Sequence, residues 1–281
     1  MTVTNVVVGV DGSDLARAAV GWARHLAVGR VEPRLDLVHA IAPIPDDAGY
    51  TLRLWDDLQW GGKAVLDQAA AQVGGVDVAT HLVEGFPAAE ILALGRQVGA
   101  ELCVVGARGL GRAVDFLLGS VSSEVIYRSE APVLVVKNDG AASVRRVLVG
   151  VDGSAHSVRA LQFAAQWLPG AELVAMNVVH VPAETMRIFE QMEIAAAIGA
   201  EHAARKTVER VVQEAGVAPE RVQVHTAVGS AAQELLTEAG MEKYDLMVMG
   251  RRGLGGLGGL LLGSVSESVL RLATCPVLLV R

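Results

Sequence analysis

Two glycine-rich segments, residues 106–120 and 250–264, have residue types suited to binding phosphate groups. Both fit the pattern G-x2-G-x9-G-S, in which the glycines and the final serine keep one spacing. Glycine lets the main chain approach a ligand closely and adopt positive φ, and consecutive N–H groups then form a concave surface for an anion. The spacing therefore predicts an anion-binding loop in each half of the chain.

Neighbouring polar residues strengthen this prediction. A helix that begins at Ser120 offers unpaired amides and the positive end of its dipole, and the hydroxyl groups of Ser120 and Ser122 are further donors. The guanidinium groups of Arg108 and Arg252 are suited to phosphate oxygens, although a solvated surface position explains these arginines equally well. The loops thus combine main-chain and side-chain donors.

Asp11 and Asp152 follow the first strand of each half, in the sequence Gly-Val-Asp-Gly-Ser. Their carboxylates are suited to accept hydrogen bonds from ribose hydroxyls, or to hold a metal ion that bridges phosphates. A simpler interpretation is a turn, because Asp-Gly is a favoured turn pair. Ser13 and Ser154 are expected to cap the helices that follow.

Two better-known phosphate motifs do not fit the chain. Gly111 is followed by Arg112 and Ala113, so the first loop lacks the lysine and the hydroxyl of a Walker loop. Residues 253–258 match the dinucleotide fingerprint, but the first half has Val114 in place of the third glycine, and we interpret the match as chance. The histidines show no metal-ligand spacing, so we predict no protein-built metal site.

The two loops belong to an internal repeat. Residues 6–13 match residues 147–154 at seven of eight positions, and residues 104–122 match residues 248–266 at 12 of 19. The last strands, 131–136 and 275–280, correspond as well. We therefore expect two copies of one domain, at 1–138 and 146–281, joined by the short polar linker Asn138–Arg146.

Each copy alternates short apolar strands with helices. This order predicts an α/β fold, with a parallel sheet covered by helices on both faces. In the first copy, helices are expected from Ser13, over about 55–73, at 90–98 and at 120–128. Strands are expected at 6–10, 35–41, 77–83, 101–106 and 133–137, and in the second copy near 147–151, 171–179, 221–227, 245–250 and 277–280.

Composition excludes several classes of function. The charge of −7, from 24 basic and 31 acidic residues, and the 4% of aromatic residues disfavour nucleic-acid binding. Cys103 and Cys275 form no CxxC or zinc spacing, which favours a reducing compartment. No apolar run reaches the roughly 18–20 residues of a membrane span, so we expect a cytoplasmic protein with no membrane partner.

The sequence resembles the universal stress protein family in its tandem two-domain form. The resemblance rests on GVDGS, on G-x2-G-x9-G-S-V-S and on a PVLVV-type last strand, and it covers essentially the whole chain. It implies two tandem doubly wound domains, each with a five-stranded parallel sheet. It further implies that ATP or a related adenine nucleotide, with or without Mg²⁺, binds between the first and fourth strands, with adenine near residues 38–40 and 176–178.

The nucleotide-binding positions that follow from this resemblance occur in both halves. In the first half they are Gly9, Asp11, Ala40, Gly106, Ala107, Arg108, Gly109, Leu110, Gly111, Arg112, Gly119, Ser120, Val121 and Ser122. In the second half they are Gly150, Asp152, Val178, Gly250, Arg251, Arg252, Gly253, Leu254, Gly255, Gly256, Gly263, Ser264, Val265 and Ser266.

The resemblance favours a regulatory stress-response protein that acts through nucleotide-dependent conformation or partner binding. The alternative is a slow ATPase or nucleotidyl-transfer enzyme on the same fold. No activated nucleophile, general-base histidine or phosphate clamp of arginine plus lysine is visible, so we expect at most weak ATP hydrolysis. A scaffold with vestigial sites is disfavoured, because both copies keep their glycines.

The halves also differ, which predicts unequal affinities for nucleotide. Arg112 and Asp115 occur only in the first copy, where the second has Gly256 and Gly259. The exposed edges of the last strands, 132–137 and 276–281, are expected to pair the two copies as a pseudo-twofold unit. Further assembly into a homodimer is compatible with the sequence, and the protein partner stays open.

Overall fold

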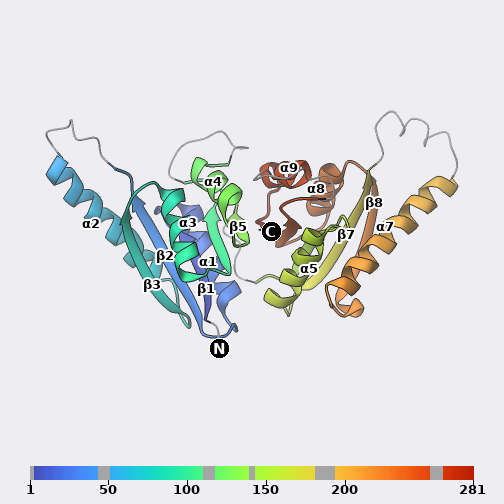
Figure 1. Ribbon diagram of the computed structural model, residues 1–281, viewed down its shortest axis with the longest axis horizontal. Coiled ribbons are helices and arrows are strands. Elements are labelled where there is room, and N and C mark those ends of the chain that lie inside the picture. The colour runs from blue at the N-terminus through green and yellow to red at the C-terminus, as the bar shows by residue number, and fades with distance from the viewer. Residues whose placement is uncertain (1–2, 44–50, 110–117, 139–142, 181–193, 254–261) are drawn as a thin grey trace. The chain divides into compact units, whose positions relative to one another are not determined.

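The computed structural model describes residues 3–43, 51–109, 118–138, 143–180, 194–253 and 262–281. By its internal contacts the chain divides into two units, Met1–Ser143 and Val144–Arg281, which we call domain 1 and domain 2. Each domain alternates strands and helices along the chain (Figure 1). The α/β fold expected from the sequence is therefore confirmed.

The elements of domain 1 begin and end close to the predicted positions. They are β1 (Thr4–Gly9), α1 (Asp14–Ala27), β2 (Pro33–Ile41), α2 (Thr51–Ala70), β3 (Asp77–Glu84), α3 (Pro87–Val98), β4 (Leu102–Gly106), α4 (Ser120–Arg128) and β5 (Val133–Val136).

Domain 2 repeats this order in its described residues. Its elements are β6 (Arg146–Gly150), α5 (Ala155–Trp167), β7 (Glu172–His180), α7 (Ile194–Glu214), a 3₁₀ turn (Pro219–Arg221), β8 (Val222–Gly229), α8 (Ala231–Met241), β9 (Leu246–Gly250), α9 (Ser264–Leu272) and β10 (Val277–Val280).

The strands of domain 1 lie in the order β3-β2-β1-β4-β5, and those of domain 2 in the order β8-β7-β6-β9-β10. All of these neighbouring strands pair in parallel. The helices α1 and α2 cover one face of the first sheet, and α3 and α4 cover the other (Figure 1). Right-handed crossovers produce this division, because the chain reverses its direction across the sheet after β3.

The reversal leaves a switch point between β1 and β4 in domain 1, and between β6 and β9 in domain 2. The chain leaves β1 toward α1 on one face and leaves β4 toward α4 on the other. A crevice therefore opens at the carboxyl ends of these two strands. Both glycine motifs identified in the sequence begin at this edge.

Apolar burial and helix caps explain why the first helix forms where it does. The valines of β1 are fully buried, and α1 buries Trp22 and Leu26 against the sheet. The side-chain oxygen of Ser13 accepts a hydrogen bond from the Ala16 N–H (3.2 Å). The cap predicted at Ser13 is thus confirmed, as is the one at Ser154, which accepts from Ser157 N–H (3.2 Å).

Some predicted boundaries were wrong by a few residues. The helix α3 begins at Pro87 rather than at residue 90, because proline has the φ of the first helical turn and loses no hydrogen bond there. The helix α2 spans 51–70 rather than 55–73, and the residues after Ala70 form a turn. No helix of the described residues is long and apolar enough to cross a membrane.

Candidate functional site

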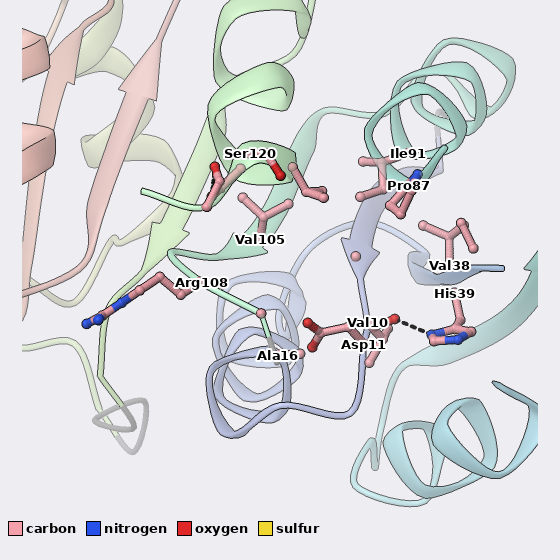
Figure 2. Close-up of a pocket in the computed structure, with 17 residues that line it drawn as sticks. Val10, Asp11, Ala16, Val38, His39, Pro87, Ile91, Val105, Arg108 and Ser120 are labelled. Carbon is pink, nitrogen blue, oxygen red and sulfur yellow. Dashed lines mark hydrogen bonds between the residues drawn. The ribbon is translucent and has the colours of Figure 1, made fainter. Parts of the chain in front are cut away.

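A cavity of about 430 Å³ opens at the switch point of domain 1 (Figure 2). Its volume falls within the range of pockets that hold small molecules, roughly 300–1,000 Å³. It is lined by β1 and the turn after it, the end of β2, the start of α3, the loop after β4 and the start of α4. The lining residues are Gly9, Val10, Asp11, Ala16, Val38, His39, Ala40, Pro87, Ile91, Val105, Gly106, Arg108, Gly109, Gly119, Ser120, Val121 and Ser122.

Asp11 lies opposite the glycine loop within this cavity. One of its carboxylate oxygens, Oδ1, accepts a hydrogen bond from the Ser13 N–H (2.9 Å), which fixes the turn into α1. The other oxygen, Oδ2, is so close to Gly109 that a Cβ atom on this residue would overlap it. The Asp-Gly turn and the carboxylate facing the glycine loop are therefore both present, and the two interpretations of Asp11 are compatible.

Hydrogen bonds join the two described ends of the glycine-rich segment, residues 106–109 and 118–122. Gly119 N–H donates to the carbonyl of Ala107 (2.8 Å), and the buried hydroxyl of Ser122 donates to the same oxygen (2.9 Å). Ser122 thus fixes the loop, and its hydroxyl is already engaged there rather than directed to a ligand. Ser120, at the first position of α4, is exposed and lines the cavity.

The other end of the cavity is apolar. Val38 and Ala40 are two residues apart on β2, so their side chains lie on the same face of the sheet. Pro87 and Ile91 of α3 complete the apolar wall. His39, between the two β2 residues, is bonded through its Nδ1 to the carbonyl oxygen of Val10 (2.7 Å), as Figure 2 shows. An apolar slot next to a polar glycine loop suits a ligand with a flat base at one end and phosphates at the other.

Arg108 lines the cavity, but its guanidinium points away from Asp11 and Ser120 in Figure 2. A contact between this group and a phosphate in the cavity needs a different side-chain rotamer. Three of the lining glycines, Gly9, Gly106 and Gly109, leave little space for a side chain. The closest approach for the first of these is to Ile91, whose Cδ1 lies 2.6 Å from an ideal Cβ on Gly9.

Domain 2 repeats the arrangement around Asp152. Its Oδ1 accepts a hydrogen bond from Ser154 N–H (3.0 Å), and its Oδ2 would overlap a Cβ on Gly253. Gly263 N–H donates to the carbonyl of Arg251 (2.8 Å), as Gly119 does in domain 1. The relation between carboxylate and glycine loop is thus the same in both domains.

The remaining predicted positions of domain 2 also lie at this edge of its sheet. Ser266 is buried and donates to the carbonyl of Gly250 (2.8 Å), and Ser264 and Val265 begin α9. Gly150 ends β6, where the Cδ1 of Leu235 lies 3.5 Å from its ideal Cβ. Val178 is half-buried near the end of β7, beside Ala227 of β8.

Six predicted positions fall outside the described residues: Leu110, Gly111, Arg112, Leu254, Gly255 and Gly256. The same holds for Asp115, on which part of the expected difference between the copies depends. The pairing of the last strands of the two domains also stays a prediction.

The structure adds lining residues that the sequence reasoning missed. His39 lies within residues 38–40, the range suggested for adenine, but it was not predicted as a binding residue. In domain 2 the corresponding residue is Asn177, whose side chain donates a hydrogen bond to the Val151 carbonyl (2.7 Å). Pro87 and Ile91 of α3 carried no motif. A signal was present in the repeat itself, because Gly85 and Glu90 recur as Gly229 and Glu234. Both glycines have positive φ, at 155° and 151°, and each lies against the glutamate five residues later.

The donor set around Asp11 fits Mg²⁺ only in part. The described residues contain no group of three or more His, Cys, Asp or Glu side chains that could hold a metal ion. A single carboxylate can contribute one oxygen to a Mg²⁺ ion whose other ligands are phosphate oxygens and waters. Asp11 and Asp152 are therefore suited to a metal that arrives with a nucleotide.

Comparison with known proteins agrees with the repeat. The sequence profile of the universal stress protein family matches residues 2–137 and again residues 143–281. A universal stress protein of Mycolicibacterium smegmatis is 34% identical over 297 residues, which cover 98% of this chain and 96% of that protein. Universal stress protein Rv2623 of Mycobacterium tuberculosis is 33% identical over 303 residues, with the same coverage of each chain.

A solved structure shows the same fold over the full length. The crystal structure of a universal stress protein from Archaeoglobus fulgidus superimposes with a TM-score of 0.69 at 23% identity, and the match covers 99% of this chain and 98% of that one. Both the sequence and the fold thus match proteins with two such domains in succession. The chain belongs to the universal stress protein family, with two family domains in tandem.

Proposed function

We propose that each domain binds one adenine nucleotide, ATP or a close relative, at the crevice between its first and fourth strands. The bound nucleotide then acts as a signal, because a ligand that prefers one conformation shifts the protein toward it. Partner proteins would recognise that conformation. This is a regulatory role in a stress response rather than a metabolic reaction.

One observation carries the proposal. In both domains a carboxylate oxygen faces a glycine so closely that no side chain can replace it, at Asp11 with Gly109 and at Asp152 with Gly253. A turn residue alone does not require a glycine from a distant loop at this place. The repeated pair supports a site in which a carboxylate faces a phosphate-binding loop.

The two ends of the cavity in domain 1 suit different parts of a nucleotide. The apolar wall of Val38, Ala40 and Ile91 suits an adenine ring, and the glycine loop with the start of α4 suits the phosphates. Asp11, between these two regions, is placed for the ribose hydroxyls or for a metal ion on the phosphates. In this proposal each part of the ligand would face groups of matching chemistry.

The proposal is tested by identifying what the purified protein carries. The protein is denatured, and the released small molecules are identified and quantified by mass spectrometry. Protein stripped of ligand is then titrated with ATP in a calorimeter, together with the variants Gly109→Glu and Gly253→Glu.

We expect released adenine nucleotide, two ATP sites in the stripped protein and one site in each variant. Absence of any adenine nucleotide, together with no heat of binding on titration, would sink the proposal. A circular dichroism spectrum and a thermal melt of each variant show whether it is folded.

A further inference from the structure

Five basic side chains gather at the carboxyl ends of the strands of domain 2. We call them the basic cluster. They come from α5, from the loop after β9 and from the end of β10. The members are His156, Arg159, Arg251, Arg252 and Arg281.

Hydrogen bonds of the backbone and side chains bring the cluster together. Arg251 N–H donates to the carbonyl of Val280 (2.7 Å), so that Arg251 lies beside the end of β10, where Arg281 follows. Arg159 of α5 donates through its Nε to the main-chain oxygen of Arg281. Three arginines from three parts of the domain therefore meet at one edge of the sheet.

The same cluster borders the glycine loop. An ideal Cβ on Gly250 would lie 2.6 Å from the Cβ of His156 and 3.1 Å from the carbonyl oxygen of Arg252. The carbonyl of Arg251 accepts the hydrogen bond of Gly263 at the start of α9. Arg251 and Arg252 therefore belong to the loop that faces Asp152, and His156 of α5 packs against the start of that loop.

The four arginines make the surroundings of the cluster positive, and Asp152 offsets part of this charge. Arg251 is only 7% exposed, and burial together with the guanidinium groups of Arg281 and Arg252 lowers its pKa. Burial also lowers the pKa of His156, and Arg159, Arg252 and Arg251 act in the same direction, whereas Asp152 opposes them. Like charges that are partly removed from water repel one another strongly, and an anionic ligand relieves that repulsion.

Domain 1 has a weaker version of this arrangement. The repeat register places Leu15, Ala18, Ala107, Arg108 and Lys137 at the five corresponding positions, so three of them are uncharged. The acidic residue Asp14 also occupies the place of Ala155 in domain 2.

Each domain has one further arginine beside the turn after its first strand, and in both domains an acidic residue pairs with that arginine. Arg17 donates to the Gly12 carbonyl and pairs with Asp14, and Arg210 donates to the Gly153 carbonyl and pairs with Glu214. In the sequence, residues 110–117 contain one arginine and one aspartate, and residues 254–261 contain no charged residue. The difference in charge between the two sites therefore comes from the basic cluster.

We propose that domain 2 selects the nucleotide with the longer phosphate chain, the triphosphate over the monophosphate, whereas domain 1 discriminates little between them. This inference rests on the proposed nucleotide sites. Each added phosphate brings negative charge toward the basic cluster, where charge-assisted hydrogen bonds to guanidinium groups are stronger than those between neutral groups. In domain 1, Arg108 and Lys137 are the basic side chains at the corresponding positions, so added phosphates gain less.

Two single-site variants of the full chain test the proposal. Gly109→Glu leaves only the site of domain 2 open, and Gly253→Glu leaves only that of domain 1. Each is titrated calorimetrically with AMP, ADP and ATP in the presence of a chelator, so that metal binding does not enter. We expect the ratio of ATP affinity to AMP affinity to be at least tenfold larger for Gly109→Glu, and to fall steeply with added salt.

A third variant keeps the test decisive if the glutamate substitutions prevent folding. Arg159 is exposed, so Arg159→Ala is expected to fold, and it should weaken ATP binding severalfold at one of the two sites with less effect on AMP. The exposed Arg271, on α9 of the same domain but outside the cluster, gives the matched control Arg271→Ala, which should leave both affinities unchanged.

The outcomes separate this inference from the proposed function. Equal ratios of ATP to AMP affinity in the two single-site variants, or equal losses for the two arginine variants, would overturn the selectivity of domain 2 and leave the nucleotide sites in place. No binding of any of the three nucleotides to the unmodified protein would remove the proposed function itself.

Discussion

The substitution Gly109→Ala probes the contact between carboxylate and glycine loop with one methyl group. In the structure the new Cβ would lie less than 3.0 Å from Asp11 Oδ2, a separation that real Cβ atoms essentially never show. Either the carboxylate must rotate away, or the loop must move. Rotation breaks the bond from Ser13 N–H to the carboxylate, and movement of the loop disturbs the phosphate-binding amides.

The expected size of the effect follows from the contacts involved. A lost hydrogen bond to a charged group costs about 1.5–3 kcal/mol, and overpacking costs about 1–3 kcal/mol. These two costs are alternatives, because relief of the overlap by one route avoids the other. We therefore expect the free energy of unfolding to fall by about 1–3 kcal/mol and ATP affinity in domain 1 to fall at least tenfold, which corresponds to about 1.4 kcal/mol.

Calorimetric titration and urea unfolding of Gly109→Ala measure both quantities. The matched control is Gly170→Ala in domain 2, where an ideal Cβ meets no atom within 4 Å and φ is not positive. The control should stay within about 0.5 kcal/mol of the unmodified protein. If Gly109→Ala binds two ATP molecules with unchanged affinity and is as stable as the control, the argument from steric contact is refuted.

Three further predictions concern domain 2. Asn177→Ala leaves the Val151 carbonyl without its side-chain donor, and should lower the free energy of unfolding by about 1–3 kcal/mol in urea titrations; an unchanged midpoint would contradict this. Ser154→Ala removes a helix cap and should cost about 1 kcal/mol, whereas Ser154→Asn should restore most of it. Burial, with the hydrogen bond to Glu238, raises the pKa of Tyr244. The folded state therefore favours the protonated phenol, and this stability is complete below the ordinary pKa of about 10 and is lost as pH rises above it. Unfolding at pH 9 and pH 11 should show that loss for the unmodified protein and a smaller one for Tyr244→Phe.

Much of the fold was predictable because its signals are local and occur twice. The buried valines of the first strand, the serine caps and the glycine spacing each depend on a few neighbouring residues, and repetition separates them from chance. The start of α3 at Pro87 was missed because the apolar pattern of this helix begins only later. The contact of Ile91 with the cavity arises from the packing of α3 on the sheet, which no local pattern encodes.

The basic cluster illustrates the same limit. The sequence shows Arg251 in place of Ala107, but its burial depends on the end of β10, which lies about thirty residues further along the chain. Likewise the bond between His39 and the Val10 carbonyl exists because β1 and β2 pair in a particular register. Such features follow from tertiary contacts, which the sequence pattern alone does not specify.

Hydrogen exchange with mass spectrometry tests the central claim most directly, because it locates the ligand in both domains at once. Protein stripped of nucleotide is compared with and without saturating ATP. We predict slower exchange of amides in residues 106–109 and 119–122, and in 250–253 and 263–266, with little change in α2 and α7. No protection of either loop, or protection confined to other parts of the chain, would contradict nucleotide binding at these sites.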